Sequence, residues 1–225
     1  MNRRRMMMSL IKDTTTDLLL HFDNSLINVK DSSSPSNTYN ANQLAYTVGH
    51  FSQGIYTNSQ NIFDYPIGIE YDLPFNGKHD FTIDFWVKSS QEYTGVGIGR
   101  AYTYFSLANV RAGCDFFLQT GYGSNMIPMI YIDGNSTPYS SQGNASYSSF
   151  NHLAICYNYT TNTLYFFVNG TLTITITNAS SHTLTTSNKL IVVLGDPLSI
   201  IDEVRVSNIV RWTASFTPPT APYTI

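Results

Sequence analysis

The stretch YFFVNGTLTITIT, residues 165–177, decides the fold. Asn169-Gly170 suits a two-residue turn in which both central residues take positive φ, and the residues on either side are aromatic or β-branched. After the turn, apolar residues alternate with threonine, which is typical of a half-buried strand whose threonines face water. The stretch therefore predicts a β-hairpin. Its expected core residues after the turn are Leu172, Ile174 and Ile176.

The same kind of pattern recurs along the chain, while helical periodicity is almost absent. The clearest further strand is DFTIDFWVK, residues 80–88, in which one face is apolar and the other is mostly polar. Residues 152–159 and 163–168 form a hairpin whose second strand is also the first strand of the quoted hairpin, so three strands form a meander. The other expected strands are 17–23, two within 44–56, one within 65–76, and 101–109, 114–120, 126–132, 189–195 and 199–206.

Loops and ends complete the expected organisation. Loops are expected at residues 31–42 and 133–149, which are polar. A short helical turn is expected at residues 207–212, and the paired prolines that follow predict an extended end. Because there is no linker and no internal repeat, residues 17–225 are expected to form one all-β domain. Residues 1–16 are expected to be an arm, and its Arg3-Arg4-Arg5 cluster is read either as a frayed end or as a docking element.

Composition limits the function classes. Charged residues are 12% of the chain, about half the usual share, and the net charge is −3, so no nucleic-acid partner is expected. Residues 6–11 are too short for a signal peptide, and no run is long enough to span a membrane. We therefore expect synthesis in the cytoplasm without a signal peptide and no membrane insertion.

Cys114 and Cys156 have no metal or redox spacing and predict two buried thiols.

Five segments in order resemble a known superfamily. They are LLLHFDNS (18–25), FSQGIY (51–56), DFTIDFWVKSS (80–90), NHLAICYNYTTNTLYFFVNGTL (151–172) and IDEVRVSNIVRWTASFTPPTAPY (201–223). Together they resemble the concanavalin A-like lectin/glucanase superfamily in its laminin-G-like or pentraxin-like branch. The last segment is similar to the form found in bacteriophage tail and virion proteins. The resemblance implies a jelly-roll β-sandwich of two antiparallel sheets, with the first strand beside residues 199–206. The alternation predicts one dry and one wet face for each sheet.

Catalysis is not expected. Glucanases of this superfamily carry Glu-x-Asp-x-x-Glu or a close variant on one strand, and two carboxyl groups must face one glycosidic bond. Asp80 and Asp84 share a face but lack the third acid, whereas Asp202 and Glu203 are adjacent and are expected on opposite faces. The five histidines are scattered, and no Gly-x-Ser-x-Gly motif is present. His21 and His152 match family strand positions and are expected to be hydrogen-bonded, half-buried side chains.

Metal and sugar binding remain open. No cofactor is required, but relatives bind calcium, and a structural calcium ion between Asp23 and Asp202 is one alternative. The other is that Asp202 or Glu203 pairs with Arg205 or Arg211, or accepts backbone N–H groups. Aromatic faces that could bind a glycan, or pack in a core or interface, are supplied by Tyr102, Tyr104, Tyr122, Tyr131 and Tyr139.

The function expected first is a non-enzymatic structural or adhesion module of a bacteriophage virion, in a tail, fibre or capsid-associated protein. It would contact other virion proteins, copies of itself or the host surface. The alternative is a lectin-like domain that binds cell-surface glycans, and a glycoside hydrolase ranks third because the carboxylate triad is missing.

Overall fold

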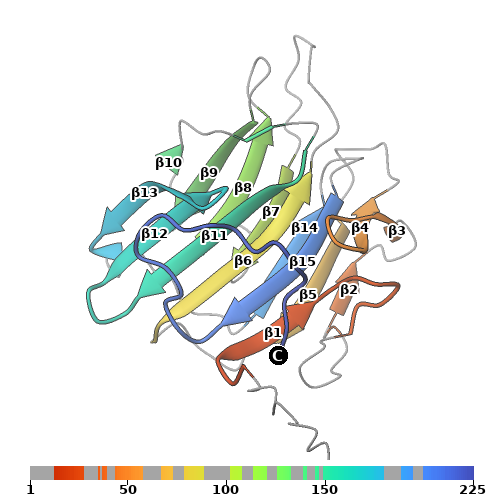
Figure 1. Cartoon of the computed structure of the whole chain (residues 1–225), viewed down its shortest axis with the longest axis horizontal. Helices are drawn as coiled ribbons and strands as arrows, with labels where there is room; N and C mark the ends of the chain where they lie inside the picture. Colours follow the sequence, from red (N-terminus) through yellow and green to blue (C-terminus); the bar gives the residue numbers. More distant parts are fainter. Residues whose placement is uncertain are drawn as a thin grey trace, which may run out of the picture.

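Two antiparallel sheets stacked face to face form the molecule (Figure 1). The computed structural model describes residues 13–27, 35, 37–39, 44–57, 67–72, 79–88, 102–107, 114–120, 126–132, 139–140, 145–146, 149–179, 189–194 and 200–225. All fifteen elements in these ranges are strands, so the all-β sandwich prediction is confirmed. No helix in these ranges is long and apolar enough to cross a membrane.

The larger sheet, here called sheet A, has the order β13-β12-β11-β6-β15-β4-β3, and β1 also pairs with β15. The pairing of β1 with β15 confirms that the first and last strands are neighbours. Sheet A consists of β1 (Thr16–Leu20), β3 (Leu44–Val48), β4 (Gln53–Thr57), β6 (Phe81–Lys88), β11 (Asn151–Asn158), β12 (Thr163–Val168), β13 (Thr171–Thr177) and β15 (Ile200–Ser207).

The second sheet, sheet B, has the order β10-β9-β8-β7-β14-β5-β2. Two of its strands lie in expected loops, since they are too short to show an alternating pattern. The expected helical turn after residue 206 is wrong, because β15 runs to Ser207 and irregular chain follows. Sheet B consists of β2 (Asn37–Tyr39), β5 (Ile67–Asp72), β7 (Tyr102–Leu107), β8 (Cys114–Thr120), β9 (Met126–Ile132), β10 (Tyr139–Ser140) and β14 (Lys189–Leu194).

The main hydrophobic core lies between the two sheets. Alternation on β6 places Phe81, Ile83, Phe85 and Val87 in this core, where each is almost fully buried. Neighbouring strands of sheet A contribute in the same way, and β5 of sheet B adds Ile69 and Tyr71. Burial of one large apolar side chain contributes about 1.5–3 kcal/mol, so this layer supplies most of the driving force for folding.

The hairpin that decides the fold forms as predicted. Asn169 and Gly170 have φ values of 50° and 75°, and Val168 pairs with Thr171 across the turn. The turn is also fixed to β11, because the Asn169 N–H donates to the His152 carbonyl at 2.8 Å and the His152 N–H donates to Asn169 Oδ1 at 2.9 Å. The turn is therefore part of sheet A's structure and not a free tip.

One part of the hairpin prediction is wrong, because a β-bulge interrupts the alternation of β13. Ile174 and Ile176 pack against the core between the sheets, whereas Leu172 packs against the opposite face. The register shifts between Phe166 and Phe167, which pair with Ile174 and Leu172, so one extra residue of β13 lies between them. An extra residue reverses the alternation, and this is why Leu172 leaves the expected face.

The prediction of a wet outer face is wrong for the centre of sheet A. Thr82 and Asp84 point away from the main core, yet both are fully buried. The chain after β15, residues 208–225, crosses this outer face and is here called the C-terminal strap (Figure 1). A second, smaller core lies beneath it, in which Trp212 and Phe216 stack at 3.8 Å over the layer that holds Ala154, Cys156 and Phe167.

Cys156 lies in this second core as a buried free thiol, as expected, and the burial raises its pKa to about 11. The side chain of Cys114 is outside the described residues.

The C-terminal strap is fixed at both ends of its first half. The Phe216 N–H donates to the Gly170 carbonyl at 2.8 Å, which joins the strap to the hairpin turn. The Arg211 guanidinium donates to Asp13 at 2.6 Å and to Ser207 at 2.7 Å, and the Asn208 N–H donates to the Thr15 carbonyl at 2.8 Å. Residues 13–15, which the sequence assigned to the arm, therefore contact the domain.

Gly170→Ala is expected to loosen the strap as well as strain the turn. A Cβ atom at Gly170 would lie 2.1 Å from the Phe216 carbonyl oxygen, and the residue has φ of 75°. Positive φ costs a non-glycine residue about 1–2 kcal/mol; the overlap with Phe216 adds to this, because backbone must move. Urea unfolding should show a larger loss of stability than this strain alone, and Trp212 fluorescence should shift toward that of exposed indole.

The matched control is Asn24→Ala. Asn24 is exposed and has φ of 54°, so this variant places alanine at a positive φ away from the strap. Equal destabilisation of the two variants would show that the contact with Phe216 contributes nothing.

Candidate functional site

Two rows of side chains cross the centre of sheet A on its outer face. The register places Asp84 of β6 opposite Ala154 and Arg205, and Trp86 opposite His152 and Asp202. Because paired residues on adjacent strands point to the same face, each row spans three strands. The first row carries the buried charges, and the second carries an indole, an imidazole and a carboxylate.

Asp84 and Arg205 form a buried ion pair. Arg205 donates from Nε at 3.0 Å and from Nη2 at 2.8 Å to the two oxygens of Asp84, whose side chain has no exposed surface. Burial by itself raises the pKa of Asp84, but the interactions with Arg205 and His152 together outweigh burial and lower the pKa to about 2. The pair is therefore ionised at neutral pH, and its paired geometry satisfies both oxygens.

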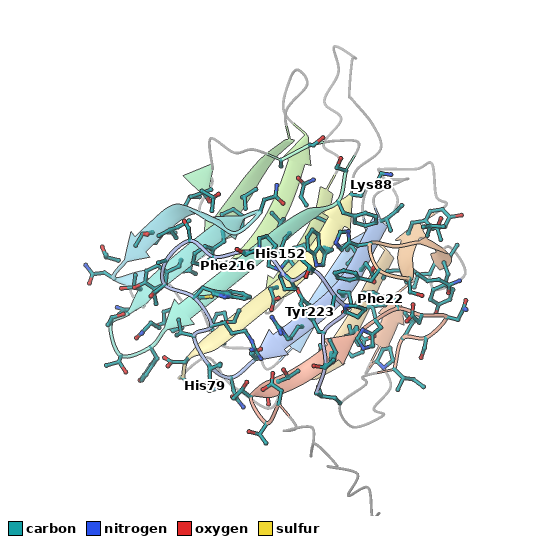
Figure 2. All side chains as sticks on the ribbon, viewed as in Figure 1. Phe22, His79, Lys88, His152, Phe216 and Tyr223 are labelled. Carbon is teal, nitrogen blue, oxygen red and sulfur yellow. The ribbon has the colours of Figure 1, made fainter. Side chains whose placement is uncertain are left out.

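The end of the C-terminal strap closes over this pair. The Tyr223 ring lies 3.9 Å from the Arg205 guanidinium carbon, and Figure 2 shows Tyr223 and Phe216 where the strap crosses the sheet. The Tyr223 hydroxyl oxygen is 3.0 Å from His152 Nε2. The backbone N–H of Tyr223 donates to Glu203 Oε2 at 2.8 Å. Burial raises the pKa of Tyr223 well above its usual value, so the ring stays neutral.

Glu203 joins the strap to the first strand. Its second carboxylate oxygen lies 2.5 Å from His21 Nδ1, and this hydrogen bond raises the pKa of His21. His21 and His152 are thus hydrogen-bonded side chains, as predicted, but the expectation that both are half-buried is wrong for His152. His21 is partly exposed and His152 is fully buried.

The expectation that Asp202 and Glu203 point to opposite faces is wrong. Glu203 has φ of 53°, and the register between β15 and β6 shifts between Asp202 and Arg205, which marks a β-bulge. Ile201 and Val204 on either side remain in the main core, while Glu203 contacts the strap on the outer face. The bulge therefore places both acids on the outer face.

Asp202 uses one oxygen to hold a turn. Its Oδ2 accepts the N–H groups of His50 at 2.7 Å and Phe51 at 3.1 Å. This is the backbone-acceptor role that the sequence gave as one alternative for Asp202. A Cβ at Gly49 would lie 2.5 Å from the same oxygen, so the turn can approach only with glycine there. Burial, with the nearby charge of Glu203, raises the pKa of Asp202 to about 6.

Three polar atoms of the second row are buried without a partner in the described structure. They are Trp86 Nε1, His152 Nδ1 and Asp202 Oδ1. Native proteins pair most buried polar groups, so this row is the candidate site on the outer face of sheet A. His50 stacks on Trp86 with ring centroids 3.7 Å apart, and it is partly exposed. Phe150 lies beside His50, with Lys88 Nζ 5.9 Å from the Phe150 ring centroid.

The residues predicted for calcium belong to two different contacts. Asp23 Oδ1 accepts the Gln53 N–H at 3.0 Å, and Asp202 holds the preceding turn through the N–H groups already described. Over the described ranges, no group of three or more His, Cys, Asp or Glu side chains is placed to hold a metal ion. Calcium binding by Asp23 and Asp202 stays a prediction.

The tyrosines predicted for glycan binding fall on the other sheet. Tyr102 and Tyr104 lie on β7, Tyr131 lies on β9 and Tyr139 lies on β10, but their side chains are outside the described residues. Tyr122 lies outside the described residues altogether.

Sequence reasoning missed the unpaired row of Trp86, His152 and Asp202 as a candidate site. One available signal was Trp86 itself, a large aromatic residue at a position of β6 that alternation assigned to water.

A laminin-G family model, described as the concanavalin A-like lectin/glucanases superfamily, matches residues 67–214. No curated protein sequence matches the chain. Solved structures resemble it at low identity. Domain 4 of AbnA, a GH43 extracellular arabinanase from Geobacillus stearothermophilus, solved in complex with arabinotriose, is 19% identical with a TM-score of 0.61. The match covers 87% of this chain and 93% of that domain.

Two toxin binding domains have the same fold. The binding domain of Paraclostridial Mosquitocidal Protein 1 is 14% identical with a TM-score of 0.64, and that of botulinum neurotoxin serotype D is 12% identical with a TM-score of 0.58. Each match covers 87% of this chain and 49% of the other, so the chain spans about half the length of these domains.

Asp84→Asn is expected to destabilise the domain strongly, because it leaves the buried Arg205 charge without its partner. Loss of one partner of a buried pair costs about 3–5 kcal/mol. The double variant Asp84→Asn/Arg205→Met should recover part of this loss, since no buried charge remains. Urea unfolding at pH 7 measures both differences, and a double variant no more stable than Asp84→Asn would show that the charge is not the cause.

The Asp84–Arg205 pair should make the free energy of unfolding of the wild type fall at acidic pH, and Asp84→Asn should lack this contribution. The pKa of Asp84 is lowered from 3.8 to about 2. Its contribution to stability is therefore complete above the higher value and is lost as pH falls toward the lower one.

Proposed function

We propose that this chain, which belongs to the concanavalin A-like lectin/glucanases superfamily, is a non-catalytic module that binds carbohydrate on a cell surface. The observation that carries the proposal is which hydrogen-bond partners the carboxylates of Asp84, Glu203 and Asp202 have on the outer face of sheet A. Asp84 is held by Arg205, and both oxygens of Glu203 are occupied by His21 and Tyr223. Asp202 alone keeps a buried oxygen without a partner in the described structure.

This arrangement favours binding over cleavage. Hydrolysis of a glycosidic bond needs two carboxyl groups that flank the bond, one to protonate the leaving oxygen and one to act as nucleophile or base. The row of Trp86, His152 and Asp202 holds one carboxyl group, which does not meet that need, while aromatic and polar side chains on a sheet meet the needs of recognition. Domain 4 of the arabinanase, with the same fold, was solved with arabinotriose, which supports sugar binding as the activity to test.

The isolated domain is expected to bind at least one immobilised oligosaccharide on an array that includes arabinotriose, and to release no reducing sugar from it. The physical reason is that the row of Trp86, His152 and Asp202 presents polar and aromatic groups with a single carboxylate. Urea-unfolded protein on the same array is the control. Silence of the folded domain across the array contradicts carbohydrate binding, and release of reducing sugar contradicts the absence of catalysis.

A second candidate is a structural or adhesion role in a bacteriophage virion, with other virion proteins or copies of the chain as partners. Residues 201–223 favour it, because they resemble the form found in phage tail and virion proteins. Most of this segment is the C-terminal strap together with β15, which makes it integral to the fold. The two candidates are compatible, since a virion protein can be the one that binds a host glycan.

If the arm docks the module in a particle, removal of residues 1–12 should abolish incorporation without changing the stability of the isolated domain. Asp13, which contacts Arg211 of the C-terminal strap, is retained in the truncated chain. Mass spectrometry of purified phage particles measures incorporation, and urea unfolding of the isolated domain is the control. Equal incorporation of the truncated and full chains would contradict a docking arm.

A further inference from the structure

The three unpaired polar atoms on the outer face of sheet A differ in whether they donate or accept a hydrogen bond. Trp86 Nε1 can only donate a hydrogen bond, and ionised Asp202 Oδ1 can only accept one. His152 Nδ1 donates or accepts according to the tautomer of the ring, whose Nε2 lies 3.0 Å from the Tyr223 hydroxyl oxygen and 3.4 Å from Asp84 Oδ2. A partner for the row must therefore both accept and donate, as a hydroxyl group does.

These atoms belong to side chains on neighbouring, paired strands. Trp86 is the direct register partner of both His152 and Asp202, so the three side chains stand on neighbouring strands at one level of the sheet. All three residues are more than nine-tenths buried, with Trp86 the most exposed at 7%. Orienting groups that are fixed in this way are typical of small-ligand sites.

An aromatic rim adjoins the row. His50 lies nearly parallel to Trp86, at 19° between ring planes, and Phe51 meets Trp86 edge to face at 6.0 Å. His50, Phe51, Phe150 and Lys88 are all partly exposed, whereas the row beneath them is buried. His50 thus covers the indole face on which the apolar face of a sugar ring could stack.

We propose that this row and rim form a subsite for one neutral sugar residue of the glycan, which deepens the proposed function and rests on it. The sugar takes the place of the His50 ring on Trp86. One hydroxyl accepts from Trp86 Nε1, and a hydroxyl donates to Asp202 Oδ1. Burial of either atom without a partner costs about 1–3 kcal/mol, and the sugar removes that cost.

The subsite differs in place from the tyrosines predicted from the sequence. Trp86 and Asp202 belong to β6 and β15 of sheet A, whereas the described tyrosine positions belong to β7, β9 and β10 of sheet B. Variants on the two sheets therefore separate the two locations.

Trp86→Phe and Asp202→Asn test the subsite on the same oligosaccharide array, arabinotriose included. Trp86→Phe keeps one aromatic ring beneath His50 and removes the N–H donor together with part of the ring surface. Asp202→Asn can still accept from the turn through its carbonyl oxygen, and it places an NH₂ donor where the unpaired acceptor was. Each change should weaken binding at least tenfold, while urea unfolding shows that the domain stays folded.

Trp212→Phe is the matched control, because it makes the same chemical change in the C-terminal strap, where the Trp212 ring meets His152 edge to face but supplies none of the three unpaired atoms. It should bind as the wild type does. A second readout is the indole N–H resonance of Trp86 in ¹⁵N-labelled protein titrated with arabinotriose. We expect this resonance to shift while that of Trp212 stays in place.

The outcomes separate the two proposals. Wild-type binding that persists in Trp86→Phe and Asp202→Asn, and is lost in Tyr131→Ala, overturns the subsite and leaves carbohydrate binding intact. A shift of other resonances with arabinotriose while that of Trp86 stays unmoved also overturns the subsite. Absence of wild-type binding to every oligosaccharide overturns the proposed function and the subsite together.

Discussion

The C-terminal strap can cover sheet A only because the charges beneath it are paired. Asp84 and Arg205 lie at the centre of the sheet, and Tyr223 rests on the guanidinium. A carboxylate or a guanidinium alone in this position would be prohibitively costly to bury, so the strap would not close over it. Once the two are joined by paired hydrogen bonds, they present a neutral and nearly flat surface, and aromatic side chains can pack on it.

Closure of the strap gives the domain two cores in place of one. The first lies between the sheets and is purely apolar in its centre. The second lies between sheet A and the strap, and it mixes a thiol, a buried ion pair and stacked rings. The strap is in turn held by the Asn169-Gly170 turn and by Asp13 near the start of the described chain. Segments far apart in the sequence therefore stabilise one another.

The bulge at Glu203 determines what the outer face can do. It brings two adjacent acids to one side of the sheet and gives them different partners. Glu203 completes the contact between strap and first strand, and Asp202 secures the turn that carries His50. Since Glu203 has no oxygen to spare, the pair does not resemble the two opposed carboxyl groups of a glycosidase. What remains is one acceptor beside an indole donor, a combination suited to recognition.

The sequence by itself determined the class of fold and most strands, because period-two alternation and the Asn-Gly turn are local properties that no distant contact has to complete. The strand at residues 80–88 and the hairpin at 165–177 show this. Resemblance of ordered segments added the pairing of β1 with β15. Alternation failed where one residue is inserted, as at Leu172 and Glu203, because a bulge depends on what the neighbouring strand requires. It failed also for Thr82 and Asp84, whose polar character indicated water. Only the tertiary structure decided that they are buried, because the strap that covers them lies more than a hundred residues away in the chain, and no local pattern encodes that contact.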